Sequence, residues 1–312
     1  MKLFITGISG CVGHYVFDEL IANPEYQLYL LVRDVKKLRF QYRNNPRITI
    51  LQGDMIGIRK HAPLLAEMDA LIHIAADWGG NQSNCELTLE MFNCLDPKRC
   101  QKIITFSTAS ILGDDNRPNP LAETIGTHYI RGKYQLYKQL PGLALYPKIT
   151  TLFPTWVLGG DQTHPYSHAA NGIIGLAKWL KLIRFFTVDA TFHFIHARDI
   201  ARITKYVLEN TVKEKDFILG NEPISASQFL REVCRYFKVP VFFQLPIPAW
   251  LVKGLAGLLR KELHPWDLYC FEKKYFVYRT VNARFFGLPA DLESPAAVIH
   301  SLAGSPDRTT PV

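Results

Sequence analysis

The sequence predicts a doubly wound α/β fold, a parallel sheet covered by helices on both faces, followed by a smaller C-terminal lobe. Three observations support this prediction. Short apolar runs alternate with helix-like stretches along the first half of the 312 residues. A glycine-rich turn joins the first apolar run to the first amphipathic stretch. The regular alternation ends near residue 155. Strands that alternate with helices form βαβ units, whose strands are parallel.

Six apolar runs are expected to form strands of this sheet. They lie at residues 4–5, 28–32, 48–51, 70–74, 103–106 and 149–153. After the first run, Val16, Phe17, Leu20 and Ile21 form an apolar stripe at helical spacing, and Asn23-Pro24 ends the helix. A helix with one apolar stripe packs on a sheet, as the predicted fold requires.

Beyond the regular alternation, aromatic residues gather at Trp179, Phe185, Phe186, Phe192 and Phe194. We therefore expect residues 1–155 to form the core, with 187–220 returning to it, and residues 156–303 to form mainly the smaller lobe. The aromatic residues suggest a rather apolar pocket there, although aromatic side chains in a lobe of this kind more often belong to its core. The polar, proline-containing tail at 304–312 is expected to be disordered.

Composition narrows the class of protein. The 36 basic and 28 acidic residues give a net charge of +8. Because the cations are scattered and no nucleic-acid motif accompanies them, we expect a solvated basic surface and no nucleic-acid partner. No apolar run approaches the roughly 20 residues of a membrane span, and no secretory signal is visible, so we expect a soluble, cytoplasmic protein. The six cysteines lack metal-site spacing, which predicts reduced thiols and no metal centre.

The turn after the first strand has the spacing of a dinucleotide-binding loop. Gly7, Gly10 and Gly13 occur between a strand and a helix, and Cys11 and Val12 begin that helix. Glycine permits the tight turn and lets the backbone approach a pyrophosphate, while the helix N-terminus offers free N–H groups to the phosphates. This context predicts a Rossmann-type cofactor site.

The end of the second strand indicates which dinucleotide is bound. An NAD-preferring fold places an acidic residue there for the ribose 2′-hydroxyl, but this strand ends in Leu31-Val32-Arg33. Arg33, with Lys37 one helical turn later, suits a 2′-phosphate. We therefore expect NADP, with NAD as the second choice; two surface cations are the alternative.

At this point the order of motifs resembles the extended short-chain dehydrogenase/reductases, the group that includes NAD(P)-dependent epimerases and dehydratases. After the glycine turn come Gly53-Asp54, His73-Ile74-Ala75-Ala76, Ser107-Thr108, Tyr129-x-x-x-Lys133, Pro154 and Asp199. The resemblance extends from residue 1 to about 290.

The resemblance implies roles for several of these residues. Asp54 and Met55 would flank the adenine, and Ala75 and Ala76 would line the floor of the cofactor site. Asn84 corresponds to the helix asparagine of the family, and Pro154 to a residue beside the cofactor. Asp199 is expected to cap a helix N-terminus and not to act as a catalyst.

Tyr129 and Lys133 are the candidate catalytic pair. A spacing of four places both side chains on one helix face, where the lysine, together with the nicotinamide, stabilises the phenolate. The resemblance also implies that Lys133 holds the nicotinamide ribose. Tyr134 and Lys138 have the same spacing. We prefer the first pair because Gly132 provides close packing there and Pro141-Gly142 ends the helix soon after Lys138.

Thr108 follows an apolar strand, and by the resemblance its hydroxyl would donate a hydrogen bond to the substrate oxygen. Ser107 and Ser110 remain possible substitutes, and any of the three hydroxyls can instead satisfy backbone groups.

Departures from the family's pattern reduce the range of activities that the sequence predicts. The short interval between Ala76 and Asn84 suggests a trimmed loop, and Ala109-Ser110 follows Thr108 where dehydratases carry an Asp-Glu pair. Phe153-Pro154-Thr155-Trp156 replaces the Arg-Pro of many nucleotide-sugar enzymes. We therefore predict an NADP-dependent oxidoreductase acting on a secondary alcohol or carbonyl of a small molecule. A nucleotide-sugar epimerase and a non-catalytic NADP-binding protein are the alternatives, and a homodimer is left open.

Overall fold

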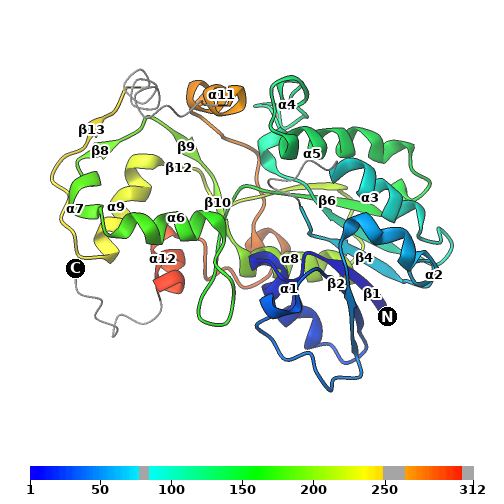
Figure 1. The fold of residues 1–312 in the computed structure, drawn as a ribbon. Coiled ribbons are helices and arrows are strands. Elements are labelled where there is room, and N and C mark those ends of the chain that lie inside the picture. The colour runs from blue at the N-terminus through cyan, green and yellow to red at the C-terminus, as the bar shows by residue number, and fades with distance from the viewer. Residues whose placement is uncertain (77–83, 249–263, 304–312) are drawn as a thin grey trace.

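The computed structural model describes residues 1–76, 84–248 and 264–303 (Figure 1). Two predictions lie outside the described residues, the trimmed loop after Ala76 and the disordered tail at 304–312. Within the described part of the chain, no helix combines the length and the apolarity needed to cross a membrane.

A seven-stranded sheet forms the centre of the larger lobe, in the order β11-β6-β5-β4-β1-β2-β3 (Figure 1). Its strands are β1 (Lys2–Thr6), β2 (Gln27–Val32), β3 (Ile48–Gln52), β4 (Ala70–His73), β5 (Lys102–Phe106), β6 (Ile149–Pro154) and β11 (Asp216–Leu219). All six neighbouring pairs are parallel. The predicted doubly wound fold is confirmed, and each of the six apolar runs forms a strand.

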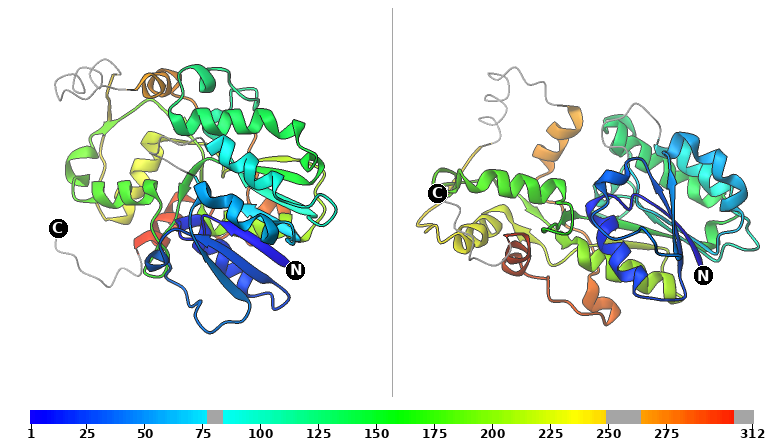
Figure 2. Two further views of the ribbon diagram at one scale, coloured as in Figure 1. Left: turned by 45° about the vertical axis from the view of Figure 1, so that its right-hand side comes forward. Right: turned by 60° about the horizontal axis from the view of Figure 1, so that its bottom comes forward.

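Helices cover both faces of the sheet. Those of the larger lobe are α1 (Cys11–Ile21), α2 (Ala62–Leu65), α3 (Asn84–Asn93), α4 (Leu121–Thr124), α5 (His128–Gln139) and α8 (Ala197–Glu209). Helices α1 and α8 pack together on one face, whereas α3 and α5 pack on the other (Figures 1 and 2). Strand β1 shows why: Leu3 and Ile5 point into the first layer and Phe4 into the second, because successive side chains alternate across a strand.

Short 3₁₀ segments complete the larger lobe, and several follow the carboxyl ends of strands. They are η1 (Val35–Lys37), η2 (Met55–His61), η3 (Ala109–Ile111), η4 (Leu140–Gly142), η5 (Tyr146–Lys148) and η6 (Ala283–Phe286). Segments η1, η2 and η3 follow β2, β3 and β5. These carboxyl ends share one edge of the sheet, where ligands bind in open α/β folds.

The smaller lobe lies beside that sheet (Figure 2). Its elements are β7 (Trp156–Leu158), α6 (His168–Ala177), α7 (Leu180–Ile183), β8 (Phe186–Thr187), β9 (Thr191–Phe192), β10 (Phe194–His196), β12 (Ile224–Ser225), α9 (Ala226–Tyr236), β13 (Leu245–Pro246), α11 (Pro265–Lys273) and α12 (Pro295–Ala303). Its strands pair only two by two. Apolar side chains of α6, α9 and α12 form a separate core, which includes Phe194 and Phe229.

The expectation that Asp199 caps a helix is wrong. Helix α8 begins at Ala197, and the ring of His196 accepts a hydrogen bond from the Arg198 N–H, 3.1 Å away. Asp199 therefore lies within the first turn, fully buried and 3.3 Å from the guanidinium of Arg202. Its burial raises the pKa of the carboxyl to about 6.

Candidate cofactor and active site

The glycine turn between β1 and α1 is shaped by two close backbone approaches. Gly7 has φ of +79°, and a Cβ there would lie 2.5 Å from the Ala75 nitrogen. A Cβ on Gly13 would lie 2.3 Å from the Gly7 carbonyl oxygen. Only glycine fits either position, because one needs the left-handed backbone and both lack room for a side chain. Ala75, a predicted floor residue, thus lies directly against the turn.

Gly10 differs from these two glycines. Among the described residues, a Cβ there would meet only the Gly7 oxygen, at 3.4 Å, so these residues leave the space above Gly10 open. Gly10 is the N-cap of α1 and has no side chain that could cap the first turn. An open helix N-terminus without acidic residues in its first turn suits a pyrophosphate.

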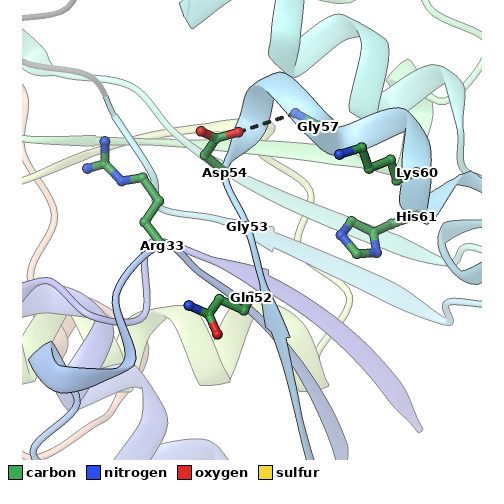
Figure 3. Close-up of a pocket in the computed structure, with 7 residues that line it drawn as sticks. All are labelled: Arg33, Gln52, Gly53, Asp54, Gly57, Lys60 and His61. Atoms are coloured by element: carbon green, nitrogen blue, oxygen red, sulfur yellow. Dashed lines mark hydrogen bonds between the residues drawn. The ribbon is translucent and has the colours of Figure 1, made fainter.

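A cavity of about 360 Å³ opens at the carboxyl ends of β2 and β3. It is lined by Arg33, Gln52, Gly53, Asp54, Gly57, Lys60 and His61 (Figure 3). Arg33 lies on one side of Asp54, and Lys60 and His61 lie on the other (Figure 3). The Asp54 carboxylate accepts hydrogen bonds from the N–H groups of Ile56 and Gly57, at 3.1 and 3.3 Å.

The cations of this cavity differ from the predicted set. Arg33 lines the cavity as expected, but Lys37, at the end of η1, is not among its lining residues. Lys60 and His61 take that place, from the segment that follows β3. Met55, the other predicted adenine neighbour, begins that segment and packs toward the core under α3.

Tyr129 and Lys133 lie together on α5, on the face turned to the sheet. Both are buried, and the side chain of Thr108 forms a hydrogen bond with Tyr129. The Lys133 ammonium donates to the carbonyl oxygen of Phe106, 2.6 Å away, at the end of β5. Burial raises the pKa of Tyr129, which the bond from Thr108 partly offsets, and burial lowers the pKa of Lys133 to about 8.

Thr108 is held in place by a second contact, because its hydroxyl oxygen also accepts from the Ser110 N–H at 3.2 Å. Of the two possible substitutes, Ser107 has a buried hydroxyl without a hydrogen-bond partner in the described chain, and Ser110 contributes its backbone to the cap of η3. The chain therefore brings Thr108, Tyr129 and Lys133 into one group.

His73 joins the last residue of β1 to helix α3. Its Nδ1 lies 2.8 Å from the Thr6 hydroxyl and its Nε2 lies 3.0 Å from the Thr88 hydroxyl. Burial and the charge of Lys133 lower the pKa of His73 well below its ordinary value, so the ring stays neutral. The neutral ring joins β1, β4 and α3 directly behind the cofactor turn.

The second Tyr/Lys pair on α5 has different surroundings. Tyr134 is buried in the same apolar cluster as Tyr129. Lys138 is exposed, 3.4 Å from the Glu123 carboxylate and 5.3 Å from the centre of the Tyr134 ring. Lys138 thus serves a surface ion pair, which contributes little to stability.

The sequence profile described as the NAD dependent epimerase/dehydratase family matches residues 3–220. The chain belongs to this family. It is therefore an enzyme of the NAD(P)-dependent oxidoreductase and epimerase type. No curated protein matches the sequence.

Solved structures with this fold are similar over nearly the whole chain. The protein gox2253 has a TM-score of 0.71 and 21% identity, with 97% of each chain covered. The Bordetella bronchiseptica enzyme WbmG, in complex with NAD, has a TM-score of 0.68 and 15% identity, with 97% of this chain and 93% of that one covered. A mutant UDP-glucuronic acid 4-epimerase from Bacillus cereus, with a fluorinated UDP sugar and NAD, has a TM-score of 0.65 and 16% identity, with 97% and 99% covered.

In this member of the epimerase/dehydratase family, the aromatic residues near Tyr129 are not those expected from the sequence. Trp266 and Tyr278 share its cluster, with Tyr269 and Phe276 packed against them. Trp179 and Phe186 are instead exposed, Phe185 packs on Phe243, and Phe192 and Phe194 belong to the core of the smaller lobe.

Helix α11 carries Trp266 and Tyr269 toward α4, where Asn119 donates to the Tyr269 hydroxyl at 2.7 Å (Figure 1). The Tyr278 hydroxyl is buried and has no hydrogen-bond partner among the described residues. Sequence reasoning missed these residues because they lie more than 130 positions after Tyr129 and carry no periodic signal.

Two further predicted residues lie on the edge that carries the site. Pro154 ends β6 and pairs in register with Leu219, and Ala76 packs against the cluster of Tyr129. Asn84 begins α3, and its side chain lies outside the described parts.

Proposed function

We propose that the protein is an NADP-dependent oxidoreductase that acts on a secondary alcohol or carbonyl of a small, rather apolar molecule. The observation that carries this proposal is the group formed by Thr108, Tyr129 and Lys133 at the carboxyl edge of the sheet. When bound, the nicotinamide supplies or accepts the hydride, and the protein must then move one proton.

Tyr129 is the candidate for that proton transfer. Its raised pKa keeps the phenol protonated at neutral pH, so in the free enzyme it is ready to donate to a carbonyl oxygen. The reverse reaction needs a phenolate, which the positive charges of Lys133 and of an oxidised nicotinamide stabilise. The Thr108 hydroxyl has one proton, so with substrate bound it would turn that proton from Tyr129 to the same substrate oxygen.

The cavity beside Arg33 supports NADP over NAD. A 2′-phosphate adds an anion at the adenosine end, and Arg33, Lys60 and His61 line the space where β2 and β3 end. The only carboxylate among the lining residues, Asp54, already accepts two backbone hydrogen bonds. A guanidinium and an ammonium group together favour an added phosphate.

The cluster around Tyr129 supports the proposal that the substrate is rather apolar. Trp266, Tyr278 and Phe153 form an apolar environment, and the Tyr278 hydroxyl, which has no partner among the described residues, offers one polar contact. Ala109 and Ser110 lie beside Thr108, so the site lacks there the carboxylate that elimination of water needs.

A nucleotide-sugar epimerase is the second candidate. The Bacillus cereus structure with UDP sugar and NAD favours it, because its fold matches this chain over 97% of the residues. An epimerase oxidises and then reduces the same carbon, so it retains its dinucleotide and shows no net use of NADPH.

The test is a screen of ketones, aldehydes and UDP sugars that follows NADPH absorbance and, separately, epimer formation. The purified protein is first analysed for retained dinucleotide. We expect NADPH oxidation with an apolar ketone or aldehyde and no such oxidation by Tyr129→Phe. Epimerisation of a UDP sugar with retained NAD would overturn the proposal in favour of the second candidate. Absence of turnover with tight NADPH binding would favour a non-catalytic protein.

A further inference from the structure

One edge of the smaller lobe exposes an unusual number of large apolar side chains. We call it the outer face, and its residues are Ile174, Leu176, Trp179, Leu182, Phe186, Val188, Phe242, Phe243 and Leu245. Phe242 is 79% exposed, Leu182 56% and Trp179 53%. Single exposed apolar residues are ordinary, but a contiguous group marks an interaction site.

The two segments that carry these residues are joined to each other. Strand β8 pairs with β13, and the Leu245 N–H donates to the Phe185 carbonyl oxygen at 2.8 Å. The rings of Phe185 and Phe243 lie 5.1 Å apart, and Arg184 donates to the Pro240 carbonyl oxygen at 2.8 Å. The outer face is therefore one surface, on the edge of the lobe away from the seven-stranded sheet (Figure 1).

The charge of the two segments is mainly positive. Residues 168–189 and 232–248 contain Lys178, Lys181, Arg184, Arg235 and Lys238, against the two acidic residues Asp189 and Glu232. Arg235 pairs with Glu232, and the Arg184 guanidinium lies over the Phe185 ring. Lys178, Lys181 and Lys238 are exposed, and no ion pair among the described residues uses them.

We propose that the outer face binds the surface of an anionic lipid bilayer. Exposed Trp and Phe side chains enter the boundary between headgroups and acyl chains, while neighbouring Lys side chains contact lipid phosphates. The Lys178 ammonium, 6.0 Å from the Trp179 ring centre, places a cation and an aromatic ring together as such a boundary requires. The binding is peripheral, since the exposed residues come from short elements.

A second copy of the chain fits this face less well. In a twofold dimer the same patch meets itself, so Lys178, Lys181 and Lys238 of both copies would approach one another. The two carboxylates of these segments, Asp189 and Glu232, already pair with Lys274 and Arg235. A bilayer containing acidic lipids supplies both the apolar layer and the negative charge.

The test is cosedimentation of the full chain with vesicles of phosphatidylcholine alone and of phosphatidylcholine with 40% phosphatidylglycerol, a composition chosen on the order of natural anionic membranes. We expect binding only to the anionic vesicles, and weaker binding as salt rises. Lys178→Gln with Lys181→Gln should weaken binding roughly 25-fold, at about fivefold per charge removed. Trp179→Ala with Phe242→Ala should weaken it by about tenfold or more.

Matched controls separate this surface from general charge and apolarity. Lys98→Gln with Lys213→Gln removes two exposed lysines of the larger lobe, and Phe285→Ala removes an exposed aromatic ring there. These variants should bind vesicles like the wild type. All variants should keep the wild-type melting temperature and NADPH affinity, which verifies their fold.

Three results would overturn the proposal. The first is a wild type that does not sediment with anionic vesicles at low salt. The second is a loss of vesicle binding by the control variants as large as that of the outer-face variants. The third is a wild-type dimer in sedimentation velocity that the outer-face variants dissociate, together with absent vesicle binding, which would assign the face to self-association.

Discussion

The two Tyr/Lys pairs of α5 share one spacing but have opposite surroundings. Lys133 is fully buried and donates to a carbonyl oxygen at the end of β5, whereas Lys138 is exposed beside Glu123. At the carboxyl ends of β2 and β3, Lys60 lines the cavity and Lys37 does not, although both side chains are exposed. Spacing places two side chains on one helix face, but the packing of that face decides whether the lysine is buried or exposed to solvent.

The largest effect is expected for the two tyrosines. Tyr129→Phe removes the proton donor but keeps the ring, so turnover should fall by about a hundredfold or more while NADPH binding and stability persist. Tyr134→Phe should change turnover little. Steady-state kinetics on the best substrate of the screen measures both. If Tyr134→Phe is inactive and Tyr129→Phe is active, Tyr134 is the proton donor in place of Tyr129. If both variants are active, a Tyr/Lys mechanism is excluded.

The lysines should show the next largest effect. Lys133→Met should lower turnover and weaken NADPH binding by about tenfold each, because the variant lacks the charge that supports the phenolate and a contact to the cofactor. Lys138→Met should leave both unchanged. Since burial holds the pKa of Lys133 at about 8, wild-type affinity for NADPH should fall as pH rises through that value.

The control for this pH effect is Lys133→Met itself, whose NADPH affinity should not change near pH 8. Fluorescence titration of NADPH between pH 6 and pH 10, on the order of two units either side of that pKa, measures both proteins. An equal decline in the two proteins would show that another group titrates.

A smaller effect is expected at the adenosine cavity. Arg33→Asp and Lys60→Ala should each lower the preference for NADP over NAD by roughly tenfold, the scale of one charge-assisted hydrogen bond. Lys37→Ala should have almost no effect. The measurement is the ratio of dissociation constants for the two cofactors in each variant. A wild type that prefers NAD would contradict the proposal that this cavity binds the 2′-phosphate of NADP. So would a change in the ratio of the two dissociation constants in Lys37→Ala.

The last effect concerns stability and not activity, at two carboxylates that contact Arg202. The pKa of buried Asp199 is raised to about 6, so the folded chain holds its proton more tightly than the unfolded chain. Its contribution to stability is full below about pH 4 and is lost as pH rises through 6. Asp199→Asn should therefore stabilise the protein by about 2 kcal/mol at pH 7 relative to pH 4, because folding raises the pKa of this carboxyl by about two units.

Asp291 provides the matched comparison. The bond from Arg202 at 2.6 Å lowers the pKa of Asp291, so its contribution to stability is present at neutral pH and is lost as pH falls. Asp291→Asn should change stability in the opposite sense and by less, since this carboxylate is largely exposed. Urea unfolding at pH 4 and pH 7 measures the free energy of unfolding of both variants. If both variants change it in the same direction between the two pH values, the burial of Asp199 does not explain how the two carboxylates differ.

The sequence by itself determined the sheet, the glycine turn and the set of candidate catalytic residues. All three depend on short-range patterns: apolar runs for β1 to β6, glycines three residues apart, and a spacing of four for Tyr129 and Lys133. Such patterns act within one element or between neighbouring elements, where geometry follows directly from the order of residues. Even the choice of Arg33 needed only its position at the end of a predicted strand.

Only the tertiary structure decided which distant residues join these groups. Lys60 reaches the cavity because the parallel strands β2 and β3 end side by side, and Trp266 and Tyr278 reach Tyr129 from a segment far along the chain. His196, and not the predicted Asp199, caps α8, because the helix begins at Ala197. The outer face likewise gathers residues 174–188 and 242–245 through one strand pair. These contacts join residues that are far apart in sequence, and no local periodicity encodes them.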